Sequence, residues 1–147
     1  MVENYPVYVV DDDEAVREAL TLLLQTIGLS VQNFADPTDF LEKVGTLPPG
    51  CVVMDIRMPR ISGLKTQQRL MEAGCNWPLI IISGHGDVNA CRQAFKNGAV
   101  DFLSKPVDEG ELIDGIQKAQ LLLADRHDAN LRIEESRMLI DSLTARE

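Results

Sequence analysis

Short apolar runs alternate along the chain with longer segments in which apolar residues recur at helical spacing. Each run has the length of a buried strand, and the alternation is typical of a parallel sheet whose strands are joined by crossover helices. We therefore predict an α/β fold in which five strands and five helices alternate. The predicted strands are Pro6–Val10, Leu29–Phe34, Cys51–Met54, Leu79–Ile82 and Val100–Leu103.

Helix-start and helix-stop residues separate these strands. Gly28 ends the first helix, Asp36 caps the second with Pro37 at its first position, and a third helix runs to Gly74. The fourth helix is predicted from about Val88 to Asn97. The fifth opens with Asp108 and Glu111, which have the spacing of a capping box.

The fifth predicted helix is unusually long, because no strong helix breaker follows until about Ile140. Its apolar residues first follow four- and three-residue steps, up to Leu123, but the same register then meets Arg126 and Asn130. Two interpretations stay open for the second half: a solvated linker helix, or a helix that pairs with a second chain. We assign residues 1–124 to one domain and residues 125–141 to a linker helix.

Composition narrows the range of functions. The chain has 147 residues and a formal net charge of −9, which argues against binding of a nucleic-acid backbone by this segment. Its cysteines, Cys51, Cys75 and Cys91, have no zinc-ligand spacing and are expected to be reduced thiols. No signal-like or membrane-spanning apolar stretch occurs, so we expect a cytoplasmic protein without membrane contact.

Acidic residues follow two of the predicted strands. Asp11, Asp12 and Asp13 come directly after the first strand, and Asp55 ends the third. In a doubly wound, flavodoxin-like sheet of strand order 2-1-3-4-5, these two strands are neighbours and their carboxyl ends meet at one crevice. Crowded carboxylates repel one another unless a cation joins them, and oxygen ligands suit Mg²⁺ or Mn²⁺. The sequence therefore predicts a metal site.

Ser83 and Lys105 follow the fourth and fifth strands and should flank the same crevice. There Asp55 can act as a carboxylate nucleophile toward a phosphoryl donor, while Lys105 offsets charge on the phosphoryl oxygens and Ser83 donates a hydrogen bond to one of them. Taken singly, these residues are more commonly a helix cap, a solvated side chain and a turn former. Their coincidence at one rim favours the chemical role.

The chain resembles the receiver domains of two-component response regulators over Val7 to about Leu123. A Gly-His-Gly-Asp stretch resembles the FixJ-like branch in particular. The segments that carry the resemblance are Val10–Asp13, Met54–Pro59, Ser62–Gly63, Ser83–Asp87 and Phe102–Pro106.

The resemblance implies a role for each rim residue. Asp55 would accept a phosphoryl group from the phosphohistidine of a sensor histidine kinase. Asp11 and Asp12 would form the acidic pair, with Asp12, Asp55 and the backbone carbonyl of Arg57 as magnesium ligands, and Asp13 would be dispensable. Lys105 would pair with a phosphoryl oxygen, and its bond to Pro106 would be cis.

The resemblance also implies a switch. Ser83 would move toward phosphorylated Asp55 and Phe102 would turn inward, remodelling a face formed by the fourth helix, fifth strand and fifth helix that the family commonly uses to form homodimers. Threonine is commoner in the family than Ser83, and Gly84 leaves an open pocket beside it. Such a domain is a phosphorylation-dependent switch, which catalyses only its own phosphotransfer and slow dephosphorylation.

The tail, Asp141–Glu147, resembles the beginning of a LuxR-type helix-turn-helix output domain, which we place at residues 142–147. DNA binding and control of transcription would then belong to sequence beyond Glu147. Two alternatives fit less well. An aspartate phosphatase would resemble a pattern with a second acid where Arg57 stands, and a flavin carrier would need a phosphate loop where residues 11–14 are acidic.

Overall fold

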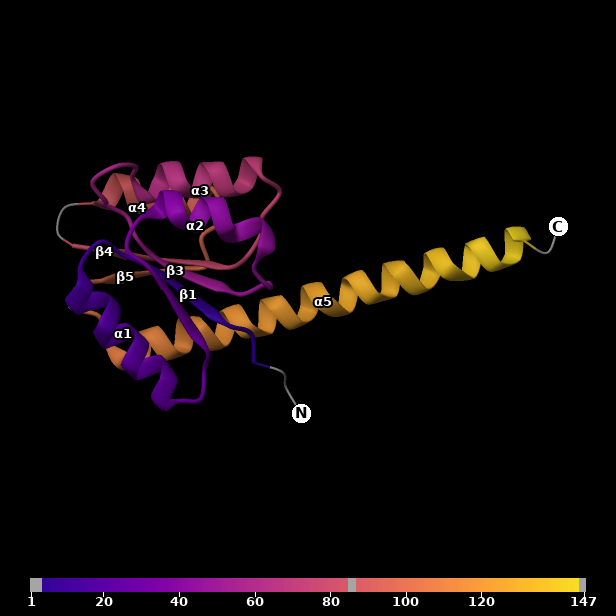
Figure 1. The fold of residues 1–147 in the computed structure, drawn as a ribbon, viewed down its shortest axis with the longest axis horizontal. Coiled ribbons are helices and arrows are strands. Elements are labelled where there is room, and N and C mark those ends of the chain that lie inside the picture. Colours follow the sequence, from indigo (N-terminus) through magenta and orange to yellow (C-terminus); the bar gives the residue numbers. More distant parts are fainter. Residues whose placement is uncertain (1–3, 85–86, 146–147) are drawn as a thin grey trace.

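The computed structural model describes residues 4–84 and 87–145, and their five strands form one parallel sheet of order β2-β1-β3-β4-β5 (Figure 1). The predicted doubly wound, flavodoxin-like architecture is therefore confirmed. The strands are β1 (Val7–Val10), β2 (Val31–Phe34), β3 (Cys51–Asp55), β4 (Leu79–Ser83) and β5 (Asp101–Ser104). The helices are α1 (Glu14–Thr26), α2 (Pro37–Lys43), α3 (Gly63–Glu72), α4 (Val88–Lys96) and α5 (Glu109–Ala145), and a 3-10 turn, Val44–Thr46, follows α2.

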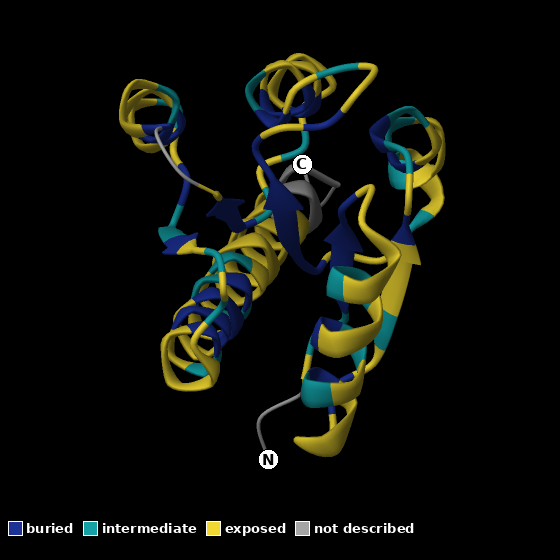
Figure 2. Cartoon of the chain, turned by 90° about the vertical axis from the view of Figure 1, so that its left-hand side faces the viewer, coloured by how far each residue is buried: buried dark blue, intermediate teal, exposed yellow. Residues whose placement is uncertain are grey.

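Helices cover both faces of the sheet. Helices α2, α3 and α4 lie on one face, and α1 and the first part of α5 lie on the other (Figure 1). One apolar layer includes Phe40 and Leu70, and the opposite layer includes Leu24 and Ile116. The central strands β1, β3 and β4 are buried along their whole length, whereas the edge strands β2 and β5 are partly exposed, as are the outer surfaces of the helices (Figure 2). Burial of apolar side chains on both faces explains why the three central strands are nearly continuous apolar runs.

Strand ends differ slightly from the predicted bounds. Strand β2 starts at Val31 because the N–H of Leu29 is used to close α1, donating to the Leu24 carbonyl at 3.1 Å. Gly28 makes this closure possible with φ +88°, a backbone conformation that favours glycine. Strand β3 includes Asp55, which pairs in register with Ile82 of β4.

Helix α5 extends far beyond the sheet (Figure 1). It begins as predicted, with the Asp108 carboxylate accepting the Glu111 N–H at 3.0 Å. It runs without a break through residues 141–145, where the tail that resembles an output domain begins, and Arg146 and Glu147 lie outside the described residues. Among the described residues, no helix is long and apolar enough to span a bilayer.

Candidate functional site

The register of the sheet brings the predicted site residues to one rim. Val10 of β1 pairs with Met54 of β3, so the residues that follow each of them, Asp11 and Asp55, are neighbours at the strand ends. Ser83 pairs with Ser104 on the other side, which places Lys105 one residue beyond the last strand pair. The rim of β1, β3, β4 and β5 therefore carries all of the predicted chemistry.

Three carboxylates gather at this rim. Asp11, Asp12 and Asp55 each offer an oxygen within 4.8 Å of the other two. Asp11 and Asp55 are buried, while Asp12 is exposed. Asp13 does not join them, because its carboxylate caps α1 by accepting the N–H groups of Ala15 and Val16. Asp13 therefore lies outside the carboxylate cluster.

Lys105 connects two of the carboxylates. Its Nζ lies 3.1 Å from Asp55 Oδ2 and 3.2 Å from Asp11 Oδ2. Burial by itself would lower the pKa of Lys105, but the hydrogen bond to Asp55 and the charges of Asp11 and Asp55 outweigh it and raise the pKa. The ammonium therefore stays charged. The Lys105–Pro106 peptide bond is cis.

The surroundings of Asp11 disfavour the charged form of its carboxyl group. Burial raises the pKa of its carboxyl, and the charge of Asp55 adds to this, against the lowering effects of the Asp13 N–H and of Lys105. Its Oδ2 is buried and has no hydrogen bond of acceptable geometry, although Lys105 is close. A buried carboxylate oxygen without a hydrogen bond is unfavourable and calls for a further positive group.

The residues present fit a divalent cation. Three carboxylates face one ammonium, so the rim has more acidic than basic groups. Mg²⁺ takes oxygen ligands in an octahedron and usually keeps several waters, which suits a site with one exposed and two buried carboxylates. Asp11, Asp12 and Asp55 are the acidic groups that would hold it.

The backbone beneath Asp55 is tightly packed. The N–H of Arg57 donates to Asp55 Oδ1 at 3.2 Å, and the N–H of Gly63, at the start of α3, donates to the Ile56 carbonyl at 2.8 Å. A Cβ at Gly63 would lie only 2.6 Å from the Asp55 carbonyl oxygen, so only glycine fits. Gly63 belongs to a motif that carried the resemblance, but its spacing alone gave no sign of this contact.

Ser83 has a partner that the sequence did not indicate. Its hydroxyl donates to Asp87 Oδ2 at 2.7 Å, and the guanidinium of Arg57 contacts Asp87 Oδ1 through Nε at 2.6 Å and through Nη2 at 2.5 Å. The hydrogen bond from Ser83, followed by that from Arg57, holds the pKa of the Asp87 carboxyl below its usual value. An aspartate before a helix would normally be interpreted as a cap, but Asp87 makes no side-chain capping bond to α4.

Phe102 lies on β5 beside α4. It is half-buried and packs against the apolar layer on the α2–α4 side. Together with Val88, Phe95 and Cys91 it lines a groove over α4 and β5. His85, in the resembling loop, lies outside the described residues.

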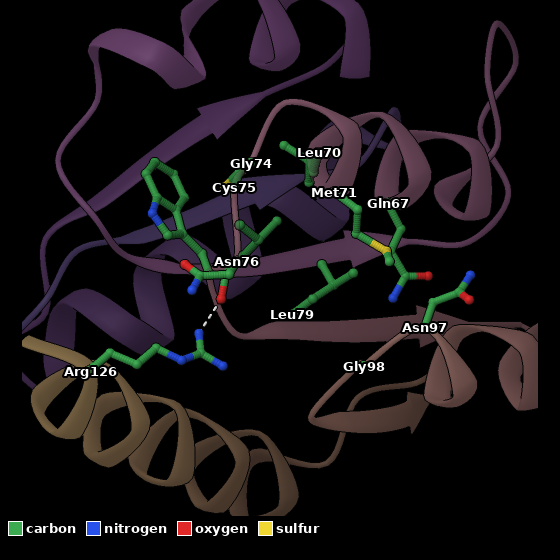
Figure 3. A pocket seen from close by; sticks show the side chains of 12 residues that line it. Gln67, Leu70, Met71, Gly74, Cys75, Asn76, Leu79, Asn97, Gly98 and Arg126 are labelled. Carbon is green, nitrogen blue, oxygen red and sulfur yellow. Dashed lines mark hydrogen bonds between the residues drawn. The ribbon is translucent and has the colours of Figure 1, made fainter. Parts of the chain in front are cut away.

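A separate cavity lies at the opposite end of the sheet. Its volume is about 340 Å³, and none of the rim residues lines it. Figure 3 shows Leu79 and the turn from Gly74 to Asn76 on one side and Arg126 of α5 on the other, with Arg126 Nη1 donating to the Asn76 carbonyl. This cavity is therefore independent of the candidate site.

Comparison with known proteins agrees with the geometry of the rim. The profile of the response regulator receiver domain matches residues 7–117. Over 141 residues the chain is 44% identical to the response regulator protein TmoT of Ectopseudomonas mendocina, covering 96% of this chain and 64% of that protein. It is 44% identical over 117 residues to the transcriptional regulatory protein FixJ of Azorhizobium caulinodans, covering 80% of this chain and 56% of FixJ.

Solved structures give the same result. The response regulator StyR superposes with a TM-score of 0.87 at 38% identity, over 94% of this chain and 70% of StyR. The amino-terminal domain of FixJ superposes with a TM-score of 0.76 at 37% identity, over 80% of this chain and 94% of that domain.

The chain belongs to the response regulator receiver domain family. It is FixJ-like, and its relatives are two-component response regulators, regulatory switches rather than enzymes of metabolism. The chain spans slightly less than two thirds of the length of TmoT and of TodT.

Proposed function

We propose that Asp55 accepts a phosphoryl group from the phosphohistidine of a sensor histidine kinase. A new bond forms between an Asp55 carboxylate oxygen and phosphorus while the phosphorus–nitrogen bond of the donor breaks. The observation that carries the proposal is the convergence of two further carboxylates and the Lys105 ammonium on Asp55 at the sheet rim.

Each rim residue has a part in this transfer. Asp11, Asp12, Asp55 and the Arg57 backbone carbonyl would hold Mg²⁺ or Mn²⁺, which when bound offsets negative charge on the transferring group. Lys105 is already within hydrogen-bond distance of Asp55 Oδ2. After the transfer its ammonium can donate to a phosphoryl oxygen instead. Asp55 is only 6% exposed, so water has limited access to the acyl phosphate.

The switch follows from the charge that is added. A phosphoryl group brings about 1.5 to 2 negative charges and three acceptor oxygens. Ser83 would exchange its present partner for one of these oxygens, and Phe102 would move inward from its half-buried position. The resulting change on α4, β5 and α5 would favour a homodimer, with slow self-catalysed dephosphorylation returning the domain to its resting state.

At the level of the whole regulator, the relatives named FixJ are transcriptional regulatory proteins. We extend this to the present chain: the receiver controls a LuxR-type helix-turn-helix domain that begins near residues 142–147, and DNA contact is made only there. The linker helix, residues 125–141, would connect the two domains. The receiver would interact with its sensor kinase in the cytoplasm.

Phosphorylation with a small donor tests the assignment of Asp55. Acetyl phosphate and Mg²⁺ should add one phosphoryl group to the wild-type chain, and Asp55→Asn should abolish it, as measured by intact mass and by a phosphate-affinity gel. Asp13→Asn is a matched control: it removes one neighbouring carboxylate but keeps a side chain that caps helices well, so labelling should persist. Undiminished labelling of Asp55→Asn would exclude Asp55 as the acceptor.

A further inference from the structure

The hydroxyl of Ser83 is held by a buried carboxylate. Ser83 is fully buried and Asp87 is 8% exposed, and the distance from Ser83 Oγ to Asp87 Oδ2 is 2.7 Å. The Gly84 carbonyl is a second acceptor at 3.2 Å, but a hydroxyl has one proton and a carboxylate is the stronger acceptor. Ser83 is thus committed to Asp87.

Arg57 fixes Asp87 in turn. Two nitrogens of its guanidinium contact Asp87 Oδ1, while Oδ2 is used by Ser83, so both carboxylate oxygens are occupied. The side chain of Asp87 is 5% exposed and that of Arg57 is 74% exposed. The arginine therefore covers the carboxylate from the solvent side, and Asp87 cannot turn away without leaving a buried charge unpaired.

A second arginine–aspartate pair, beyond the end of β2 at the same edge of the sheet, is a useful comparison. Arg60 contacts Asp36 at 3.0 Å, and its side chain is 75% exposed, almost the same as that of Arg57. Asp36, however, is 23% exposed and directs its Oδ1 to Thr38 in α2. Of the two pairs, only Arg57–Asp87 contacts a residue of the candidate switch, Ser83.

We propose that Asp87 and Arg57 form a latch that holds the Ser83 hydroxyl in its resting position and so sets the threshold for switching. The latch rests on the phosphoacceptor role proposed for Asp55. Ser83 must break its bond to Asp87 before it can donate to a phosphoryl oxygen, and part of the free energy of phosphoryl binding is used in that exchange. Arg57 lies two residues after Asp55, so the latch and the acceptor share one short segment of backbone.

Binding of beryllofluoride with Mg²⁺, a mimic of the phosphoryl group, measures the threshold. Asp87→Ala removes the competing acceptor, and the apparent affinity, followed by fluorine NMR, should rise by about tenfold, as expected for loss of a hydrogen bond to a charged group. Asp87→Asn keeps an acceptor oxygen but loses the charge and should give a smaller rise, about threefold. Thermal unfolding of both variants establishes that they are folded.

The same substitutions in a Ser83→Ala background separate the latch from simple electrostatics. If Asp87 acts through Ser83, then Asp87→Ala should leave the affinity of Ser83→Ala unchanged. If removal of a negative charge alone tightens anion binding, the tenfold rise persists without Ser83, and the latch is overturned. An Asp87→Ala variant that is folded and binds no more tightly than wild type overturns it as well.

Arg57 and Arg60 provide a matched pair for the arginine. Arg57→Gln should raise the affinity about two- to threefold because Asp87 loses its anchor, whereas Arg60→Gln, with the same charge change and exposure, should have no effect. Equal effects of the two substitutions would remove Arg57 from the latch. Wild-type chain that does not bind beryllofluoride would instead refute the phosphoacceptor role of Asp55, and the latch with it.

Discussion

The two halves of α5 belong to one continuous helix but are stabilised in different ways. In the first half, Leu112, Ile116, Ala119 and Leu123 are at most 4% exposed and pack on the sheet. In the second half, every residue from 127 to 140 is exposed. Tertiary packing therefore specifies the first half, whereas local backbone hydrogen bonds and helix propensity maintain the second.

This contrast decides where the receiver ends structurally. Arg126, which donates to the Asn76 carbonyl, is the last half-buried residue of α5 among residues 109–140. The predicted domain boundary at residue 124 falls two residues earlier and remains a prediction for the whole regulator. A helix that leaves the sheet as a rigid extension of a packed segment can transmit a movement of that segment outward.

Truncation of an apolar side chain should reveal the largest difference in stability between the two halves of α5. Ile116→Ala removes a side chain that is 2% exposed and should lower the free energy of unfolding by about 2–5 kcal/mol. Ile133→Ala removes the same atoms from a side chain that is 59% exposed, and the free energy of unfolding should change by less than about 0.5 kcal/mol. Urea unfolding followed by circular dichroism measures both, and similar losses would refute the distinction.

A polar clamp in the first half should have an intermediate effect. The Gln120 amide accepts the Tyr5 N–H at 2.7 Å and donates to the Tyr5 carbonyl at 2.8 Å, tying the segment before β1 to α5. Gln120→Ala should cost about 1–3 kcal/mol, since two hydrogen bonds are lost from a side chain that is 8% exposed. Exposed Gln117 is the control, and Gln117→Ala should be neutral by the same measurement.

Removal of the distal half should have the smallest effect. A chain ending at His127 keeps every buried position of α5 among residues 109–140, and its free energy of unfolding should change by less than about 0.5 kcal/mol. Because apolar positions in the distal half follow no single heptad register, the dimerisation constant with beryllofluoride should also be unchanged. Sedimentation velocity measures it, and a weaker dimer would favour the helix-pairing interpretation of residues 125–141.

Patterns along the sequence predicted the strand order and the rim residues because both depend on simple regularities. Continuous apolar runs identify buried parallel strands, and parallel strands place their carboxyl ends together, so Asp11, Asp55 and Lys105 could be brought to one rim without coordinates. The length of α5 was likewise visible from the lack of breakers.

Side-chain partners across the rim could not be predicted in this way. The sequence placed Ser83 beside Asp55, but the Ser83 hydroxyl donates to Asp87, and the Arg57 side chain contacts the same carboxylate. Both contacts depend on which of several nearby acceptors a side chain reaches, and the spacing of residues along the sequence does not determine this. The start of β2 depended likewise on how α1 ends, because the Leu29 N–H was taken by the helix.

Trp77 provides an optical probe at the far end of the protein. It is the single tryptophan of the sequence. Its ring stacks on that of Tyr8, with 5.4 Å between the ring centroids and 21° between the ring planes, near the amino ends of the strands. Ligands at the rim are thus remote from the fluorophore. Its emission can therefore report the folded fraction during thermal unfolding at several concentrations of beryllofluoride or of a metal. Because a ligand that binds the folded state raises the melting temperature, the size of the rise gives the dissociation constant.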